Sequence, residues 1–515
     1  MDTNTAPAAA KEAKELAMKE IELSEGPSRA SQTFYKAQTD EEKALDRRLN
    51  LKLDLIVVAI LAVQFILCGI DKTNVGFVAT STFPKDAHLK GDDIPNSLSL
   101  FSATYVPLQP VMVMLARRIG VHKFIPIQVT IWGGLCMAHA GIKGSGGLIG
   151  LRVLIGAAEA GFTQIGMYYM STLYPKAMFG LRAGLFTGMK DPGWYGMYSI
   201  AGAFAGLIAY GLLQAHTSHL HGWQVVFLVE GGLTIFVGIL SYFVLPGKLA
   251  TAWFLTEEER LHAVRRMERD LAGTHEVADS NQGMVTRRDM LDVLKDWKKL
   301  CTVLCNMTAV LPVTAFTTFL PLVVAGMGYK GNEASLMSVS PFVVGVVGLI
   351  IFVTSSDYFR ERSLHVVVGM GLGIVGIVVM ATSTDPQLRY GFTHVCLAGV
   401  FVGGPLIAVW LAGNTPWKGS RSVILGINGW SNLAGVIAGQ LFKKRFAPRY
   451  ETPLFATIGI MVAGMLGFCI IRTAYFFENR RRHRIIRDWT QEQYEEEAVN
   501  EDRRGDQRLT FIYGY

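Results

Sequence analysis

Five ionisable side chains stand inside long apolar runs of this sequence. They are Asp71, Lys72, Arg152, Glu159 and Glu230. Each costs about 2.5–3.5 kcal/mol at the centre of a membrane helix, so such residues are seldom retained without a partner or a use. Acids and bases gathered at one depth could hold an anion and exchange protons with it.

Arg152 and Glu159 are expected to share one face of a helix. They are seven residues apart, which at about 100° per residue brings them to nearly the same side, roughly 10 Å apart along the axis. The expected depths put Glu159 near mid-membrane, and Arg152, Asp71 and Lys72 in the outer half. We expect Asp71 to pair with Arg152. That pairing would leave Lys72 and Glu159 facing a shared cavity.

These residues suggest a carrier for an anion. Lys72 is the expected anchor of a substrate carboxylate, with Arg152 as a second substrate-binding base. Glu159 and Asp71 are the expected proton-coupling acids, because a carboxyl group removed from water can bind and release a proton. The alternative is that the charges only cancel one another between packed helices. Glu230, in FLVEGGLTIF, is interpreted as structural.

Uncharged polar residues in the same runs are weaker candidates for substrate binding. They are Asn74, Gln164, Tyr168, Asn428 and Asn432. Interhelical hydrogen bonds are the alternative explanation for such residues. The small-residue pairs Gly202/Gly206 and Gly435/Gly439 predict close helix contacts, without a role in binding.

The composition is typical of a membrane protein. Half of the 515 residues are hydrophobic, 18% are charged and 54 are glycine. Runs of about 20 apolar residues predict twelve transmembrane helices in two sets of six. The expected spans are 53–78, 97–116, 124–142, 147–173, 181–213, 222–245, 301–326, 335–355, 364–382, 391–412, 422–442 and 454–477. The predicted fold class is an all-α membrane protein.

The charge pattern predicts both tails in the cytosol. Residues 1–48 are polar and lack an apolar signal, so the first span is expected to direct insertion. The net charge of +7 lies mainly in tails and loops, which favours positive-inside topology over nucleic-acid binding. A basic loop at 443–449 disagrees with that topology. The predicted organisation is an N-terminal tail (1–48), an N-terminal bundle (49–245), a linker (246–300), a C-terminal bundle (301–477) and a solvated tail (478–515).

Two stretches stand out from this pattern. The linker sequence FLTEEERLHAVRRMERD predicts an amphipathic helix capped by Thr256. KDPGWYGM, at 190–197, interrupts the fifth span. Three explanations stay open: the helix starts near Trp194, the segment forms a tolerated kink, or it is a translated intron. Sequencing the spliced transcript decides between them.

Several chemistries find no support in the sequence. The six cysteines have no framework spacing, so we expect no disulfides, and Cys301 and Cys305 lack further ligands for a metal. Gly371, Gly373 and Gly376 form GxGxxG inside an apolar run, which favours helix packing over nucleotide binding. No P-loop, HExxH or GxSxG sequence occurs. We expect neither a cofactor nor an enzymatic activity.

From about residue 41 to 478 the chain resembles the major facilitator superfamily, and within it the anion:cation symporters of the fungal allantoate permease branch. The matching sequences are DKTNVG, RVLIGAAEAGF, YYMSTLYP, GWQVVFLVEG, FLTEEER, NGWSNLAGVIAGQLF and APRY. The resemblance implies twelve helices in two pseudo-symmetric six-helix bundles, alternating access, and proton-coupled uptake of small organic anions such as ureido acids or carboxylate vitamins.

The resemblance also assigns roles to residues. Arg152 and Glu159 match the fourth-helix pair that serves substrate and proton coupling, whereas Lys72 stands where the family usually has Arg. Lysine lacks the bidentate fork of arginine, so carboxylate recognition is expected to be looser or the substrate different. Two loops are similar to the superfamily's cytosolic gating motif. The first, LARRIGVHKF, supplies Arg117 and Arg118 without the motif's Asp, and the second supplies Asp357, Arg360 and Arg362.

We therefore predict a monomeric proton symporter for a small organic anion in a lipid bilayer, expected to be the plasma membrane. The alternative is a transport-inactive paralogue or nutrient sensor with the same fold. The intramembrane charges and short tails favour transport.

Overall fold

The structure is a computed structural model of the chain and describes residues 37, 39–175, 178, 197–215, 219–272, 286–329, 332–500 and 503–515. Over these residues all regular structure is helical. Ten helices are long and apolar enough to cross a membrane. Helices α6 (Val121–Ala138) and α10 (Met197–Leu213) complete the twelve spans that the sequence predicts.

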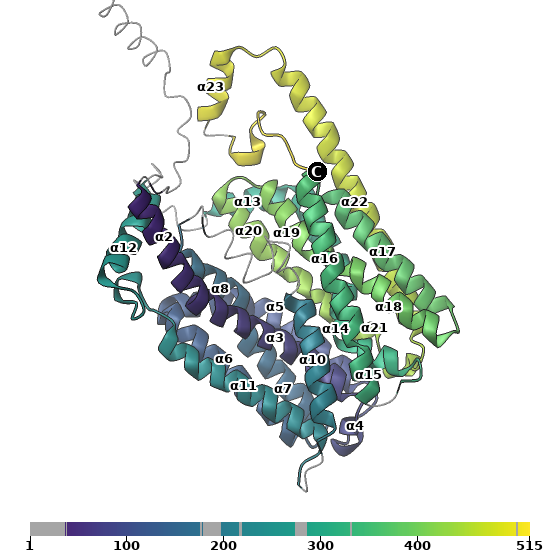
Figure 1. The fold of residues 1–515 in the computed structure, drawn as a ribbon. Coiled ribbons are helices and arrows are strands. Elements are labelled where there is room, and N and C mark those ends of the chain that lie inside the picture. Colours follow the sequence, from purple (N-terminus) through teal and green to yellow (C-terminus); the bar gives the residue numbers. More distant parts are fainter. Residues whose placement is uncertain are drawn as a thin grey trace, which may run out of the picture.

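The first six spans form the N-terminal half, coloured purple to teal in Figure 1. Besides α6 and α10 they comprise α2 (Asp40–Leu53), η1 (Asp54–Val58) and α3 (Ala59–Val78) as one continuous rod, α5 (Asp93–Ile119), α7 (Ser145–Glu159) with α8 (Phe162–Ser171), and α11 (Gly222–Val244). Short helices α4 (Phe83–Asp86) and η2 (His139–Gly141) connect them. Residues 190–196 lie outside the described residues, so the three explanations for the interrupted fifth span stay open.

The last six spans form the C-terminal half, coloured green to yellow. They are α14 (Trp297–Ala325), α15 (Asn332–Met337) with α16 (Val339–Phe359), α17 (Ser363–Thr382), α18 (Pro386–Val400) with α19 (Gly403–Gly413), α20 (Lys418–Asn428) with η5 (Gly429–Leu433) and α21 (Ala434–Leu441), and α22 (Glu451–Ile486). Outside the spans lie η3 (Leu249–Thr251), α12 (Glu257–Ala272), α13 (Arg287–Lys295), η6 (Lys444–Phe446), α23 (Gln491–Val499) and η7 (Gly505–Gln507).

The two ends of the molecule differ in what they carry. Helices α2, α12, α13 and α23 gather at one end, which we call the termini face, and α4 and α15 lie at the other end, the opposite face (Figure 1). Capping side chains help to fix where the helices at the termini face begin. The Thr256 hydroxyl accepts from the Glu259 amide, and the Glu259 carboxylate accepts from the Thr256 amide, so the predicted cap of α12 is present.

The halves meet closely at the opposite face because glycines replace side chains there. A Cβ at Gly76 of α3 would clash with the Thr318 carbonyl of α14, and one at Gly439 of α21 would clash with the Pro95 carbonyl of α5. A Cβ at Gly202, Gly206 or Gly435 would also clash, with the side chains of Phe342, Val339 and Ser102, which confirms the predicted close contacts at the two glycine pairs. A hydrogen bond from Gln440 to Ser99 (3.1 Å) adds to this seal.

The linker helix α12 packs against α2 at the termini face. His262 and Arg266 both contact the Asp46 carboxylate, at 2.9 and 3.3 Å, and Lys52 contacts Glu259 at 2.7 Å. Arg266 is fully buried in this contact. The N-terminal tail was predicted to end at residue 48, which lies inside α2, so the last part of that segment is a packed helix.

The C-terminal residues return to the bundle. Helix α22 continues to Ile486, beyond the predicted span, and residues 503–515 fold back against its end. Tyr513 is 3% exposed and stacks on Tyr475 at 4.4 Å, while its backbone exchanges hydrogen bonds with the Asn479 side chain. Lys299 of α14 contacts Asp506 at 2.8 Å. The expectation of a solvated tail is therefore wrong for residues 503–515.

Candidate functional site

A cavity lies between the two halves, on the termini side of the glycine contacts. Five elements supply its walls: α3, α5 and α7 from the N-terminal half, and α14 and η5 from the C-terminal half. The lining residues are Lys72, Val75, Ser97, Leu98, Phe101, Ser102, Tyr105, Arg152, Thr314, Thr317, Thr318 and Asn432. Both predicted substrate-binding bases thus border one cavity that the two halves share.

Lys72 lies between an acid and an aromatic wall. Its Nζ is 3.7 Å from Glu159 Oε2 and 4.4 Å from the centre of the Tyr105 ring. Phe101, one turn earlier on α5, stacks on Tyr105 with 5.6 Å between ring centres and 15° between planes. The ammonium group is therefore held by a carboxylate on one side and an aromatic face on the other, which favours a cation at this position.

Glu159 lies at a break in the fourth span. It is the last residue of α7, and Gly161, with φ of 76°, is the N-cap of α8, so the helix is interrupted at Ala160 and Gly161. A break inside a membrane helix leaves carbonyl groups without donors, which other side chains must supply. The Gln128 amide of α6 does so, donating to the Ala158 and Ala160 carbonyls at 2.8 and 3.0 Å. The break directs the Glu159 side chain toward Lys72 and Cys68 of α3.

Arg152 is buried, and its guanidinium group donates hydrogen bonds to two groups of α3. Its Nη1 donates to the Asp71 backbone carbonyl (3.0 Å) and its Nη2 donates to Asn74 Oδ1 (2.7 Å). The Asn74 amide in turn donates to Glu230 Oε2 at 3.0 Å. The expected pairing of the Asp71 carboxylate with Arg152 is therefore replaced by contacts to the neighbouring backbone and amide, because the Asp71 side chain points toward α6 and α11.

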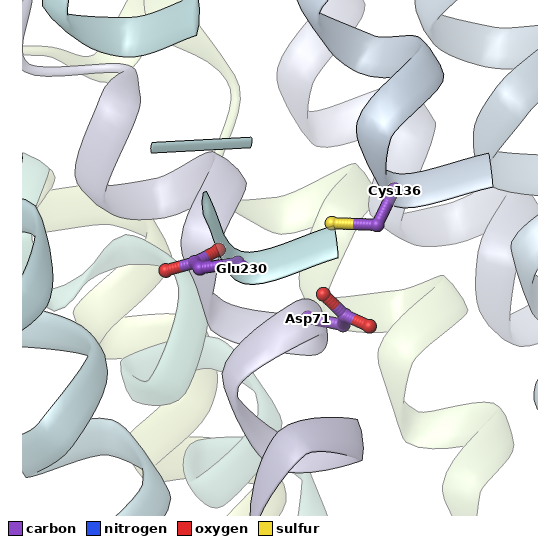
Figure 2. A group of neighbouring side chains, drawn as sticks. All are labelled: Asp71, Cys136 and Glu230. Atoms are coloured by element: carbon purple, nitrogen blue, oxygen red, sulfur yellow. The ribbon is translucent and has the colours of Figure 1, made fainter. Parts of the chain in front are cut away.

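The Asp71 carboxylate joins Cys136 and Glu230 in a buried group, drawn in Figure 2. One ligand atom from each of the three lies within 4.8 Å of the other two. Asp71 is 1% exposed and Glu230 is 2% exposed. Glu230, which the sequence analysis set aside as structural, therefore belongs to the same charged cluster as the expected site residues.

The remaining predicted substrate residues are divided by the structure. Asn432 lines the cavity, whereas the Asn428 amide oxygen accepts from Asn306 at 2.8 Å, outside the lining. Gln164 contacts Gln109 at 3.2 Å, also outside it. Tyr168 lies near the end of α8 under the Arg117 guanidinium, with 4.5 Å to the ring centre. The break after Glu159 explains this misplacement, because residues beyond it no longer continue the face of α7.

The amino-acid sequence matches the model of the Major Facilitator Superfamily over residues 61–439, most of the chain. This chain belongs to the Major Facilitator Superfamily. Three fungal relatives align with this chain over 80–90% of their own length. The MFS-type transporter efuF of Hormonema carpetanum is 30% identical over 86% of this chain and 88% of its own. The major facilitator-type transporter hxnP of Emericella nidulans is 27% identical over 88% and 90%. The high-affinity nicotinic acid transporter of Saccharomyces cerevisiae is 26% identical over 86% and 80%.

Solved structures show the same major facilitator fold. A D-xylose–proton symporter superposes with a TM-score of 0.60 at 14% identity, covering 81% of this chain and 97% of its own. A bacterial homologue of the human lysosomal transporter Spinster, inward-facing and occupied, superposes with a TM-score of 0.58 at 14% identity, covering 81% and 96%. The relatives are named as transporters, and this chain is a fungal-type major facilitator transporter.

The two expected gating loops of this major facilitator transporter lie at the termini face. Arg117 and Arg118 end α5, and Arg118 is exposed. In the second copy Asp357 forms an ion pair with Arg362, and Arg360 caps α16. The Arg362 amide also donates to the Tyr515 carbonyl at 2.6 Å, which connects this loop to the docked C-terminal residues.

Two groups of cavity residues were not predicted from the sequence. Phe101 and Tyr105 are four residues apart on α5, and Thr317 and Thr318 lie three and four residues after Thr314 on α14. Both spacings place the residues on one helix face. That periodicity was available in the sequence, but nothing in it distinguishes a face that lines a cavity from one that packs against a neighbour.

Proposed function

We propose that this transporter imports a small organic anion together with protons by alternating access. The observation that supports this most directly is the contact between Lys72 and Glu159. A base that borders the shared cavity is neutralised by a fully buried acid 3.7 Å away. Such a pair offers an anion a place to bind only if the acid changes its charge.

The coupling step follows from that competition. A substrate carboxylate that binds Lys72 displaces Glu159 from the lysine ammonium group and leaves a second negative charge in a site of low dielectric. Binding of a proton by Glu159 removes that repulsion, so substrate and proton favour each other's binding. For a monoanion one proton makes the cycle electroneutral. A second proton would couple uptake to the membrane potential at about 2.3 kcal/mol per 100 mV.

Access to the site is proposed to alternate between the two faces. The close glycine contacts between the halves at the opposite face support closure on that side. The positive-inside pattern assigns the termini face to the cytosol, so the structure corresponds to a state closed toward the exterior. We further propose that the protein works as a monomer in the plasma membrane.

The substrate class is proposed to be a planar monocarboxylate. Lys72 provides the cation for the carboxylate, and the stacked Phe101 and Tyr105 rings provide a flat apolar wall beside it. Three threonines and Asn432 face them from the other half. The relative named as a nicotinic acid transporter supports the same chemistry, and nicotinate is therefore the first probe.

The test is uptake of labelled nicotinate, with allantoate and other carboxylates as a panel, into cells that lack their own permeases, at two external pH values. Glu159→Gln should abolish accumulation against a gradient and its dependence on external pH, while exchange of bound substrate persists in part. Glu257→Gln, an exposed acid of α12, is the matched control and should behave as wild type. Accumulation that still follows the pH gradient in Glu159→Gln would refute the coupling role.

Lys72→Ala tests the anchor in the same assay. We expect the apparent affinity for the transported carboxylate to fall, and Lys72→Arg to restore much of it because the charge is kept. Lys143→Ala, an exposed lysine, is the control. Wild-type affinity in Lys72→Ala would show that Lys72 does not anchor the substrate carboxylate. Absence of uptake of every carboxylate by correctly localised wild-type protein would favour the transport-inactive alternative.

A further inference from the structure

The buried group of Asp71, Cys136 and Glu230 lies behind the cavity, where α3, α6 and α11 meet (Figure 2). Asp71 and Glu230 come from different helices, yet their carboxyl groups approach within 4.8 Å. Neither residue lines the cavity. Two acids held this close inside a membrane bundle repel each other strongly if both are ionised.

The hydrogen bonds around the two acids are incomplete. Among the described residues no N–H or O–H group donates to either carboxyl oxygen of Asp71 or to Glu230 Oε1, and Asp71 has only the weakly donating Cys136 thiol beside it. Asn74 supplies the bond to Glu230 Oε2. Buried polar atoms are nearly always satisfied, and an ionised carboxylate can only accept. A single added proton would turn one carboxyl group into the missing donor and the other into its acceptor.

The charge balance of the cluster also favours one bound proton. Three acids, Asp71, Glu159 and Glu230, stand against two bases, Lys72 and Arg152. Lys72 is engaged by Glu159, and the Arg152 guanidinium is directed at the Asp71 backbone and the Asn74 amide. The cluster therefore carries one uncompensated negative charge, which one proton between Asp71 and Glu230 would neutralise.

Other titratable groups near the pair do not supply that compensation. Cys136 of α6 contributes a thiol to the group itself, and Cys68 of α3 donates to Glu159 at 3.4 Å. His139, one turn after Cys136, is fully buried beside Phe227, with Nδ1 2.9 Å from the Leu135 carbonyl. That leaves a bound proton as the simplest ligand of the pair.

We infer that Asp71 and Glu230 form a proton-binding site that holds one shared proton and is separate from Glu159. The site is joined to the cavity through Asn74 and Arg152, because Arg152 touches both Asn74 and the cavity wall. Only the use of this proton in transport rests on the proposed function. The binding of the proton depends on the geometry of α3 and α11 alone.

The experiment is infrared spectroscopy of the purified full-length protein, titrated with protons in H₂O and D₂O without substrate. We expect a C=O stretching band of a buried protonated carboxyl group at neutral pH. Asp71→Asn and Glu230→Gln should each remove or shift this band, and the double variant should lack it. Glu159→Gln, which replaces the other buried acid, should retain it.

Both amide replacements preserve side-chain size, and helical circular dichroism with size-exclusion chromatography identifies any variant that fails to fold. The inference is wrong if wild type has no such band, or if the band is identical in both single variants. It is also wrong if NaCl or ZnCl₂ displaces the band at constant ionic strength, because the pair then binds a metal cation. Since no substrate is added, failure of nicotinate uptake leaves this result unaffected.

Discussion

The two halves of this transporter share a fold but differ in what they place at the centre of the membrane. Among the described residues of the spans, the central ionisable groups come from α3, α7 and α11 of the N-terminal half. The C-terminal half lines the cavity with Thr314, Thr317, Thr318 and Asn432, which carry no charge. Under the proposed function, the N-terminal half would bind the carboxylate and the proton, while the C-terminal half would contact the uncharged part of the substrate.

The halves also differ in how they are fastened at the termini face. In the N-terminal half α12 packs on α2 through charged pairs around Asp46 and Glu259. In the C-terminal half residues 503–515 dock through aromatic stacking on Tyr475 and hydrogen bonds to Asn479. The first contact is mainly ionic and the second mainly apolar, so they should respond differently to mutation and to pH.

Arg152→Lys is expected to have the largest effect. Lysine keeps the charge but loses the fork that joins the Asp71 carbonyl to Asn74, and buried partners are left without donors. Uptake of the transported carboxylate should fall on the order of 100-fold at unchanged surface expression. The control is Arg47→Lys, an exposed arginine of α2, which should keep wild-type uptake. Retention of more than about a tenth of the rate would contradict a central role for the N-terminal charges.

Tyr513→Ala should loosen the C-terminal residues without stopping transport. Removal of a buried aromatic ring costs about 3 kcal/mol, so amides in residues 503–515 should exchange hydrogen on the order of 100-fold faster. Ile512→Ala is the matched control, because Ile512 is 40% exposed. Hydrogen exchange with mass spectrometry makes the measurement. Equal protection in the two variants would argue against the docked arrangement.

Asn432→Ala sharpens the proposed role of the C-terminal half. Loss of one hydrogen bond to the substrate should raise KM about tenfold, with the dependence of uptake on external pH unchanged. Asn428→Ala, whose amide is held by Asn306 outside the cavity, should raise KM less. Concentration series of uptake at two pH values measure both quantities. A changed pH dependence in Asn432→Ala would break the proposed division between the halves.

Glu259→Gln should have the smallest effect, and it should depend on pH. Burial alone would raise the pKa of Glu259, but hydrogen bonds from Lys52 and the Thr256 amide hold the pKa below its ordinary value. The stabilisation is therefore present above the unfolded pKa near 4.3 and is lost as pH falls through the folded value. Thermal unfolding should show that Glu259→Gln lowers the free energy of unfolding by at most about 1 kcal/mol at pH 7.

In acid below the folded pKa the Glu259→Gln variant and wild type should unfold alike. Glu257→Gln, exposed in the same turn of α12, should match wild type throughout. A difference that persists unchanged in acid would mean that the ion pair with Lys52 is not its source.

The number of spans and the identity of the charged cluster were predictable from the sequence. Lipid demands about 20 apolar residues per span and penalises a charge whatever its neighbours are, so both signals are local. The capped helix at Thr256 was predictable for the same reason. The grouping of Lys72, Arg152 and Glu159 needed only helical periodicity and depth.

The direction of individual side chains was not predictable in this way. The break after Glu159 depends on donors from Gln128 of another helix, and it moves Tyr168 away from the cavity. Asp71 was predicted to lie near the other charged residues, but its turn toward Glu230 depends on how α11 packs on α3. The docking of residues 503–515 was not predicted, because the few apolar side chains of these residues lie in a polar segment whose composition indicates a solvated tail.

One consequence follows from the spacing of Lys72 and Gly76 on α3. They are one helical turn apart, about 6 Å along a rigid rod. Lys72 meets the cavity, and Gly76 rests against the Thr318 backbone where the opposite face is sealed. Any rotation that moves Gly76 away from Thr318 must also move Lys72, so the cavity-lining base and the helix contact at the opposite face move together as one rigid unit.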